Sequence, residues 1–66
     1  MEIVVNGRSM EARDGVTLED LLAGLGVRRA FTAVAVNREI APRSAYPTTV
    51  LRAGDRIEIV HPMAGG

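Results

Sequence analysis

The most distinctive reactive group in this sequence lies at its C-terminal end, where the last two residues are Gly65 and Gly66. Two consecutive glycines carry no side chains and restrict the backbone little, so such a tail could thread a channel too narrow for Cβ atoms. Residues 63–66, fully extended, would reach at most about 13–14 Å. A terminal carboxylate on Gly66, ionised at neutral pH, could carry a chemical group only after a partner enzyme activated it, for example as an acyl-adenylate.

The side chains offer little catalytic chemistry. The absence of cysteine excludes disulfides, cysteine-ligated zinc or iron–sulfur sites and a cysteine nucleophile. His61 is the single histidine, which excludes a pair of histidine metal ligands, and Ser9 and Ser44 lack any recognisable base partner. The eight acidic residues are scattered without the spacing of a calcium loop. We therefore expect no catalytic residue and no metal site, and a binding or carrier module rather than an enzyme.

Composition and charge restrict the possible partners. The 66 residues suffice for one small domain, and a hydrophobic content of 47% is too high for a disordered chain. Eight arginines balance eight acidic residues and there is no lysine, so no net charge draws the chain to nucleic acid or to an anionic membrane. Because no segment is long and apolar enough for a signal peptide or a membrane span, a cytoplasmic location is expected by default.

The first half of the sequence predicts a hairpin followed by a helix. Alternating residues over 2–6 indicate a strand, and a weaker strand follows over 8–12. Between them, Asn6-Gly7 is a strong hairpin signal because a type I′ turn needs φ > 0 at both central positions. Thr17 and Asp20 have the spacing of a capping box, and Gly26 is suited to end the helix. The apolar stripe of this helix consists of Leu18, Leu21, Leu22 and Leu25.

The second half predicts three further strands. They are expected over 32–36, over 39–41, where Pro42 ends the strand, and over 56–60, with 43–53 mostly irregular. The order hairpin, helix, strand, short strand, strand is typical of an α+β fold in which a sheet of four to five strands grasps one helix. We expect a domain over 1–62 and a flexible tail over 63–66.

The strand pattern also predicts which residues face the helix. The residues expected to face it are Ile3, Val5, Val34, Val36, Ile57 and Ile59. The residues expected on the opposite face are Val4, Ala33, Ala35, Glu58 and Val60. Several of the latter are apolar, which hints at a partner surface. Isolated valines and alanines are also ordinary on protein surfaces, so the pattern alone leaves both interpretations open.

Together these features resemble the ubiquitin-like sulfur carriers, a β-grasp family, and most closely the ThiS type of thiamine thiazole synthesis. The matching segments are Ala33-Val34-Ala35-Val36-Asn37, Ile40-Ala41-Pro42-Arg43, Gly54-Asp55-Arg56-Ile57 and Ala64-Gly65-Gly66. The resemblance covers essentially the whole chain. After the Pro-Arg pair, that family often has an acidic residue and then tryptophan, where this sequence has Ser44-Ala45-Tyr46.

The resemblance implies a mechanism. A ThiF-like adenylyltransferase would use ATP to adenylate Gly66, sulfur from a cysteine desulfurase would convert it to a thiocarboxylate, and a ThiG-like thiazole synthase would take the sulfur. The carrier itself would hold no permanent cofactor. We expect Ala64 and Gly65 to thread the partner's active site, and Val60 and Met63 to contribute to partner docking.

Three alternatives remain at this stage. The small subunit of molybdopterin synthase shares the fold and the tail, but it is typically longer, and Asn37 followed by Pro42-Arg43 favours the thiamine carrier. A β-grasp interaction module with a fortuitous tail is a second possibility. An RNA-binding β-grasp domain is disfavoured because Phe31 and Tyr46 are the only aromatic residues available for stacking on bases.

Overall fold

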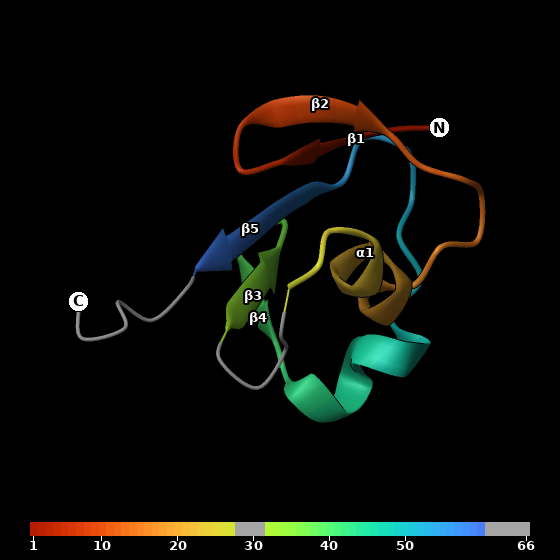
Figure 1. Cartoon of the computed structure of the whole chain (residues 1–66). Coiled ribbons are helices and arrows are strands. Elements are labelled where there is room, and N and C mark those ends of the chain that lie inside the picture. Colours follow the sequence, from red (N-terminus) through yellow and green to blue (C-terminus); the bar gives the residue numbers. More distant parts are fainter. Residues whose placement is uncertain (28–31, 61–66) are drawn as a thin grey trace.

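The fold consists of a five-stranded sheet packed on one α-helix. The computed structural model describes residues 1–27 and 32–60. The strand order in the sheet is β2-β1-β5-β3-β4. Figure 1 shows the sheet wrapping one side of helix α1, with the short helix η2 beneath it. The elements in chain order are β1 (Glu2–Val5), β2 (Arg8–Glu11), α1 (Leu18–Gly24), β3 (Ala33–Val36), β4 (Glu39–Ala41), η2 (Arg43–Thr48) and β5 (Arg56–Val60).

The sheet is mixed, with β5 at its centre. β5 pairs in parallel with β1 and antiparallel with β3, and the other pairings are antiparallel. The predicted α+β, β-grasp architecture is confirmed. The strands over 39–41 and 56–60 have the predicted bounds. β1 ends one residue before the predicted 6, β2 ends one residue before the predicted 12, and β3 begins one residue after the predicted 32.

The core lies between the sheet and α1. Its strand members point inward from β1, β3 and β5, as the alternating pattern predicted, although Val5 and Val36 are only partly buried at its rim. Burying one such aliphatic side chain contributes roughly 1.5–3 kcal/mol relative to leaving it exposed. The buried apolar residues are Ile3, Val16, Leu18, Leu21, Leu22, Val34, Tyr46, Leu51, Ile57 and Ile59.

The C-terminal end of α1 corrects one predicted core residue. Leu25, expected to continue the apolar stripe, is 41% exposed, because the helix ends at Gly24 and Leu25 is its C-cap. Gly26 has φ +72° and reverses the chain, as predicted. The N–H of Val27 then donates to the carbonyl oxygen of Leu22 at 2.9 Å, which closes a Schellman motif. The reversal leaves Leu25 partly exposed at the end of the helix.

The segment 43–53, predicted to be mostly irregular, contains the 3₁₀ helix η2 and a core residue. Tyr46 within η2 is only 1% exposed. The hydroxyl of Thr49 donates to the carbonyl oxygen of Ala45 at 2.7 Å and helps to close the turn. A 3₁₀ helix has three residues per turn and no long apolar stripe, so the 3.6-residue pattern did not reveal it.

Two asparagine side chains fasten the central strand from both sides. Asn6 and Asn37 occupy the first positions of the two hairpin turns, with φ +50° and +51°. The Oδ1 of Asn6 accepts the N–H of Ile59 at 2.8 Å, and the Oδ1 of Asn37 accepts the N–H of Arg56 at 3.0 Å. The amide nitrogen of Asn37 also donates to Asp55 at 3.1 Å. We call these contacts the asparagine clamps, because they extend both ladders of β5.

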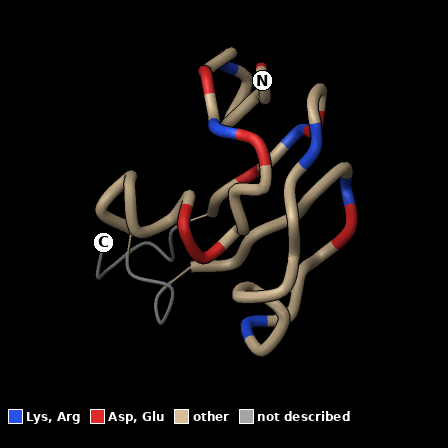
Figure 2. Tube along the Cα trace, turned by 90° about the vertical axis from the view of Figure 1, so that its right-hand side faces the viewer, with Lys and Arg blue, Asp and Glu red and all other residues tan. Residues whose placement is uncertain are grey.

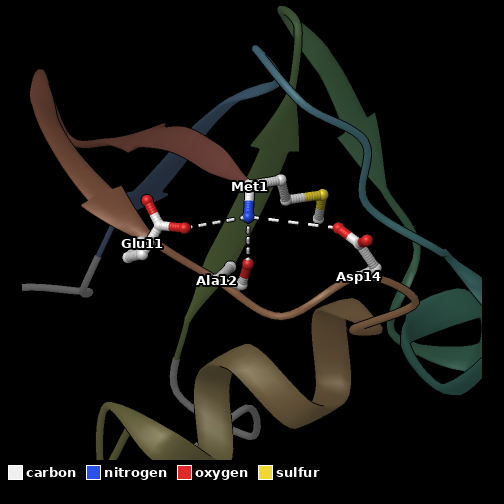
Figure 3. A network of polar contacts seen from close by, with 4 residues as sticks. All are labelled: Met1, Glu11, Ala12 and Asp14. Atoms are coloured by element: carbon white, nitrogen blue, oxygen red, sulfur yellow. Dashed lines mark hydrogen bonds and ion pairs between the residues drawn. The ribbon is translucent and has the colours of Figure 1, made fainter.

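The α-amino group of Met1 fastens the far edge of the sheet (Figure 3). It donates to Glu11 Oε2 at 3.0 Å and to the carbonyl oxygen of Ala12 at 2.7 Å, with Asp14 Oδ1 at 4.0 Å. The hydrogen bond with Glu11 is the largest cause that raises the pKa of this amine above its ordinary value. Desolvation lowers the pKa by less than this hydrogen bond raises it, and the charges of Glu11 and Asp14 raise it further. The ammonium thereby continues the β1–β2 ladder beyond the strands.

We predict that Thr17→Ala destabilises the fold by about 1 kcal/mol at neutral pH, because it removes the capping-box acceptor for the N–H of Asp20 at 3.1 Å. Hydrogen bonds from Thr17 lower the pKa of Asp20 in the folded protein. The ionised Asp20 therefore stabilises the fold at a pH above its unfolded-state pKa, and this stabilisation is lost as the pH falls through the lower folded-state pKa. Urea unfolding of both proteins should therefore show a difference that narrows below about pH 4. Thr17→Ser is the control that keeps the cap, and a difference independent of pH would contradict the assignment.

We also predict that Asn6→Gly destabilises the fold more than Asn37→Gly. Glycine accepts the positive φ at both turns, so the comparison isolates the side-chain hydrogen bonds. Ile59 is 7% exposed, and its N–H would lose its acceptor in a buried position, at a cost of about 1–3 kcal/mol. Arg56 is exposed, and water can replace the lost acceptor of its N–H. Urea unfolding and amide exchange at position 59 measure the effect, and equal losses in the two variants would refute this reading.

Candidate functional site

The C-terminal end of β5 is the part of the described structure nearest to the predicted site. β5 ends at Val60, directly before residues 61–66 in the sequence. The predicted docking residue Met63, the predicted threading residues Ala64 and Gly65, and the predicted modification site Gly66 all lie outside the described residues. The structure therefore describes the base from which the predicted tail would start.

Side chains of β5 alternate strictly between the core and the opposite, outer face of the sheet. Ile57 and Ile59 point inward and are buried, whereas Arg56, Glu58 and Val60 are exposed. Val60 is 61% exposed. Val60 thus lies on the face and at the strand end where the sequence analysis placed it, available to a partner that approaches the tail.

Val60 belongs to an apolar patch that crosses three adjacent strands. The register sets Ala33 of β3 opposite Val60, and Ala35 of β3 opposite Ile40 of β4. Cross-strand partners have Cβ atoms about 4.5–5.5 Å apart, so these side chains form one surface. Ile40 is 74% exposed, the most exposed large apolar residue among those described. We call Ala33, Ala35, Ile40 and Val60 the outer patch.

Ile40 was missed as a candidate site residue by the sequence analysis. Its strand has only three residues, too few to reveal which face a side chain takes. The signal that could have found it is the tight turn at Asn37-Arg38, because a two-residue hairpin fixes the register and sets Ile40 opposite Ala35. Since Ala35 was expected on the outer face, Ile40 had to share that face.

The chemistry open to the outer patch is apolar binding. Its members carry no titratable or nucleophilic group, and the nearest charged side chain on the same strand face is Glu58. Within 1–27 and 32–60, no group of three histidine, cysteine or acidic residues is placed to hold a metal ion. None of the helices in this part of the chain is long and apolar enough to cross a membrane. The patch can therefore bury surface against a partner but offers no group that reacts.

Two residues of the matching segments, Asn37 and Pro42, and Tyr46 of the segment that departs from the family pattern have structural roles. Asn37 is one of the asparagine clamps, and Pro42 is the N-cap residue of η2 with extended backbone angles. Tyr46 fills the core and is 1% exposed, so its ring is not on the surface where a partner could touch it. These three positions therefore have roles within the fold itself.

A family model described as the ThiS family matches residues 3–66. Two curated relatives are named thiazole synthase. The protein of Magnetococcus marinus is 42% identical and that of Paramagnetospirillum magneticum 39% identical, over all 66 residues. The chain spans only 20% of the length of each of these two relatives.

A third relative matches from end to end. The sulfur carrier protein ThiS of Escherichia coli is 35% identical over 66 residues, which cover 100% of both chains. Among solved structures, the crystal structure of the thiamine biosynthesis protein ThiS from Geobacter metallireducens superposes with a TM-score of 0.85 at 30% identity, over 100% of both chains. A match of this breadth, with a common fold, shows that the chain belongs to the ThiS family.

Proposed function

We propose that this protein is a sulfur carrier of thiamine biosynthesis, and that the terminal carboxylate of Gly66 carries the sulfur. The observation that carries the proposal is the end-to-end match to the E. coli sulfur carrier, which includes the Gly65-Gly66 end. Two features of the fold support the proposal. The outer patch provides an exposed apolar face for docking, and β5, the strand that precedes the tail in the sequence, is held at the centre of the sheet. In this role the protein is a carrier on which other enzymes act.

The chemistry requires activation, because a carboxylate is a poor electrophile. A carboxylate oxygen of Gly66 attacks the α-phosphorus of ATP, pyrophosphate leaves, and an acyl-adenylate forms on a ThiF-like enzyme. A persulfide sulfur, supplied through a cysteine desulfurase, then attacks the carbonyl carbon and expels AMP. A second thiol then attacks the donor's sulfur in the resulting acyl disulfide, forms a new disulfide with it, and releases the thiocarboxylate on Gly66. None of these steps needs a side chain of the carrier.

The sequence fits a carrier whose own side chains should not compete for the activated tail. The sequence has no lysine and no cysteine, the side chains that would attack an acyl-adenylate most readily. The α-amino group of Met1 is held as an ammonium by Glu11 and the carbonyl oxygen of Ala12. A protonated amine is not a nucleophile, so the activated Gly66 would persist until the sulfur donor arrives.

A thiazole synthase is the proposed acceptor of the sulfur. Two relatives of about five times this length bear that name and contain a segment similar to the whole chain. A carrier segment within the same polypeptide as a synthase supports a partnership between the two activities. The proposed docking surface for both the activating enzyme and the synthase is the outer patch, from which the tail would enter either active site.

We predict that incubation with a ThiF-like enzyme, ATP and a sulfur donor raises the intact mass by the difference between one sulfur and one oxygen atom. Removal of Gly66 should abolish this gain, because the new terminal carboxylate, on Gly65, ends one residue short of the position that Gly66 would reach. A variant with an added C-terminal alanine is a matched control that keeps Gly66 but blocks its carboxylate. A full mass gain in either variant would show that the sulfur is not attached at the carboxylate of Gly66.

We predict further that Val60→Asp raises the KM of the activating enzyme for the carrier about tenfold, because the lost burial of one valine is worth about 1.5 kcal/mol. The matched control is Val50→Asp. Val50 is 54% exposed, against 61% for Val60, but it pairs with Thr17 in an isolated bridge outside the outer patch. Equal effects of the two substitutions would remove the outer patch from the proposal.

A further inference from the structure

A hollow of about 520 Å³ lies along the N-terminal half of β5, next to the outer patch, since Glu58 in its lining is the cross-strand partner of Ala35. It sits between the two hairpin turns, with Gly7 on one side and Asn37 on the other. Its charged lining residues are Arg38, Arg56 and Glu58, and none of the three makes an ion pair within the described part of the chain. We call it the turn hollow. It presents two unpaired guanidinium groups and one carboxylate to whatever approaches.

The backbone at Arg38 gives independent reason to look for a role of its side chain. The two hairpins use the same two-residue turn, and the first has glycine at its second position, with φ +82°. The second turn has Arg38 at its second position, with φ +70°. Residues other than glycine and asparagine disfavour this left-handed backbone region. A disfavoured conformation that persists where glycine would fit points to a function for the side chain.

The turn hollow shares the outer face with the outer patch. Arg56, Glu58 and Val60 project from the same side of β5, and the four residue steps from Arg56 to Val60 span about 13 Å. Figure 2 shows both basic and acidic residues along the strands and loops, whereas α1 carries acidic residues at its start and no basic residue in its last turn. A protein that covers the outer patch would therefore also reach the turn hollow.

We infer that the turn hollow is a second docking point of the carrier, which receives carboxylate side chains of the activating enzyme on Arg38 and Arg56. This inference rests on the proposed function and names the surface chemistry of its first partner. Glu58 in the same hollow disfavours a free dianion such as phosphate, whereas a protein surface can place acids against the arginines and a donor against Glu58. The apolar outer patch would supply buried area, and the arginines would steer and orient the approach.

The test uses the variants Arg38→Gly and Arg56→Gln, singly and combined, in thiocarboxylate formation with a ThiF-like enzyme, ATP and a sulfur donor. The double variant should lower kcat/KM about tenfold at about 0.05 M salt, leave kcat unchanged, and approach the wild type at about 0.5 M salt. Arg38→Gly should also raise the midpoint of thermal unfolding, because it relieves the positive φ. Higher stability together with weaker docking is a result that a merely structural role of Arg38 does not produce.

The matched control is Arg52→Gln, which removes one exposed arginine that does not line the hollow. An equal loss in this control, or a double variant as fast as an active wild type, overturns the inference and leaves the proposed function intact. Saturable shifts of the amide signals of residues 38 and 56 with inorganic phosphate alone overturn the carboxylate assignment in favour of a small-anion site. A wild type that gains no sulfur overturns the proposed function, and with it this inference.

Discussion

The central position of β5 is the constraint on which the rest of the structure depends. A strand between two neighbours must satisfy backbone groups on both edges, yet β1 reaches only as far as residue 57 along it. The side chain of Asn6 continues this ladder to Ile59, and that of Asn37 begins the opposite ladder at Arg56. Both amides come from turns that need φ > 0, so the residues that reverse the chain also fasten the strand that leads to the tail.

Fixing β5 in this way determines what each face of the sheet can do. Ile57 and Ile59 point into the core. Because side chains alternate along a strand, Arg56, Glu58 and Val60 must lie on the outer face. β3 and β4 then add Ala33, Ala35 and Ile40 beside Val60 through the register alone. The outer patch is thus a consequence of pairing geometry. The outer face therefore has an apolar end beside the tail and a charged end beside the turns.

Local signals explain which parts were predictable from the sequence. The turn at Asn6-Gly7, the capping box at Thr17 and the reversal at Gly26 each depend on a few neighbouring residues, and each formed as predicted. Tyr46 and Leu25 were not predictable in this way. Tyr46 is buried because η2 packs against α1. Leu25 is exposed because α1 ends at Gly24, one residue before the predicted apolar stripe ends. The four predicted residues of the tail depend on partners, so this structure leaves them as predictions.

The contrast between the two hairpin turns argues that stability is not the only constraint on this fold. Glycine at the second turn position would relax the backbone, and the first turn has it at Gly7. The second turn keeps Arg38 at φ +70°, on the rim of a hollow that also contains Arg56. A carrier without reactive side chains depends on how well its surface is recognised, because its partners supply the catalytic groups. Strain that presents a guanidinium group to a partner is consistent with that dependence.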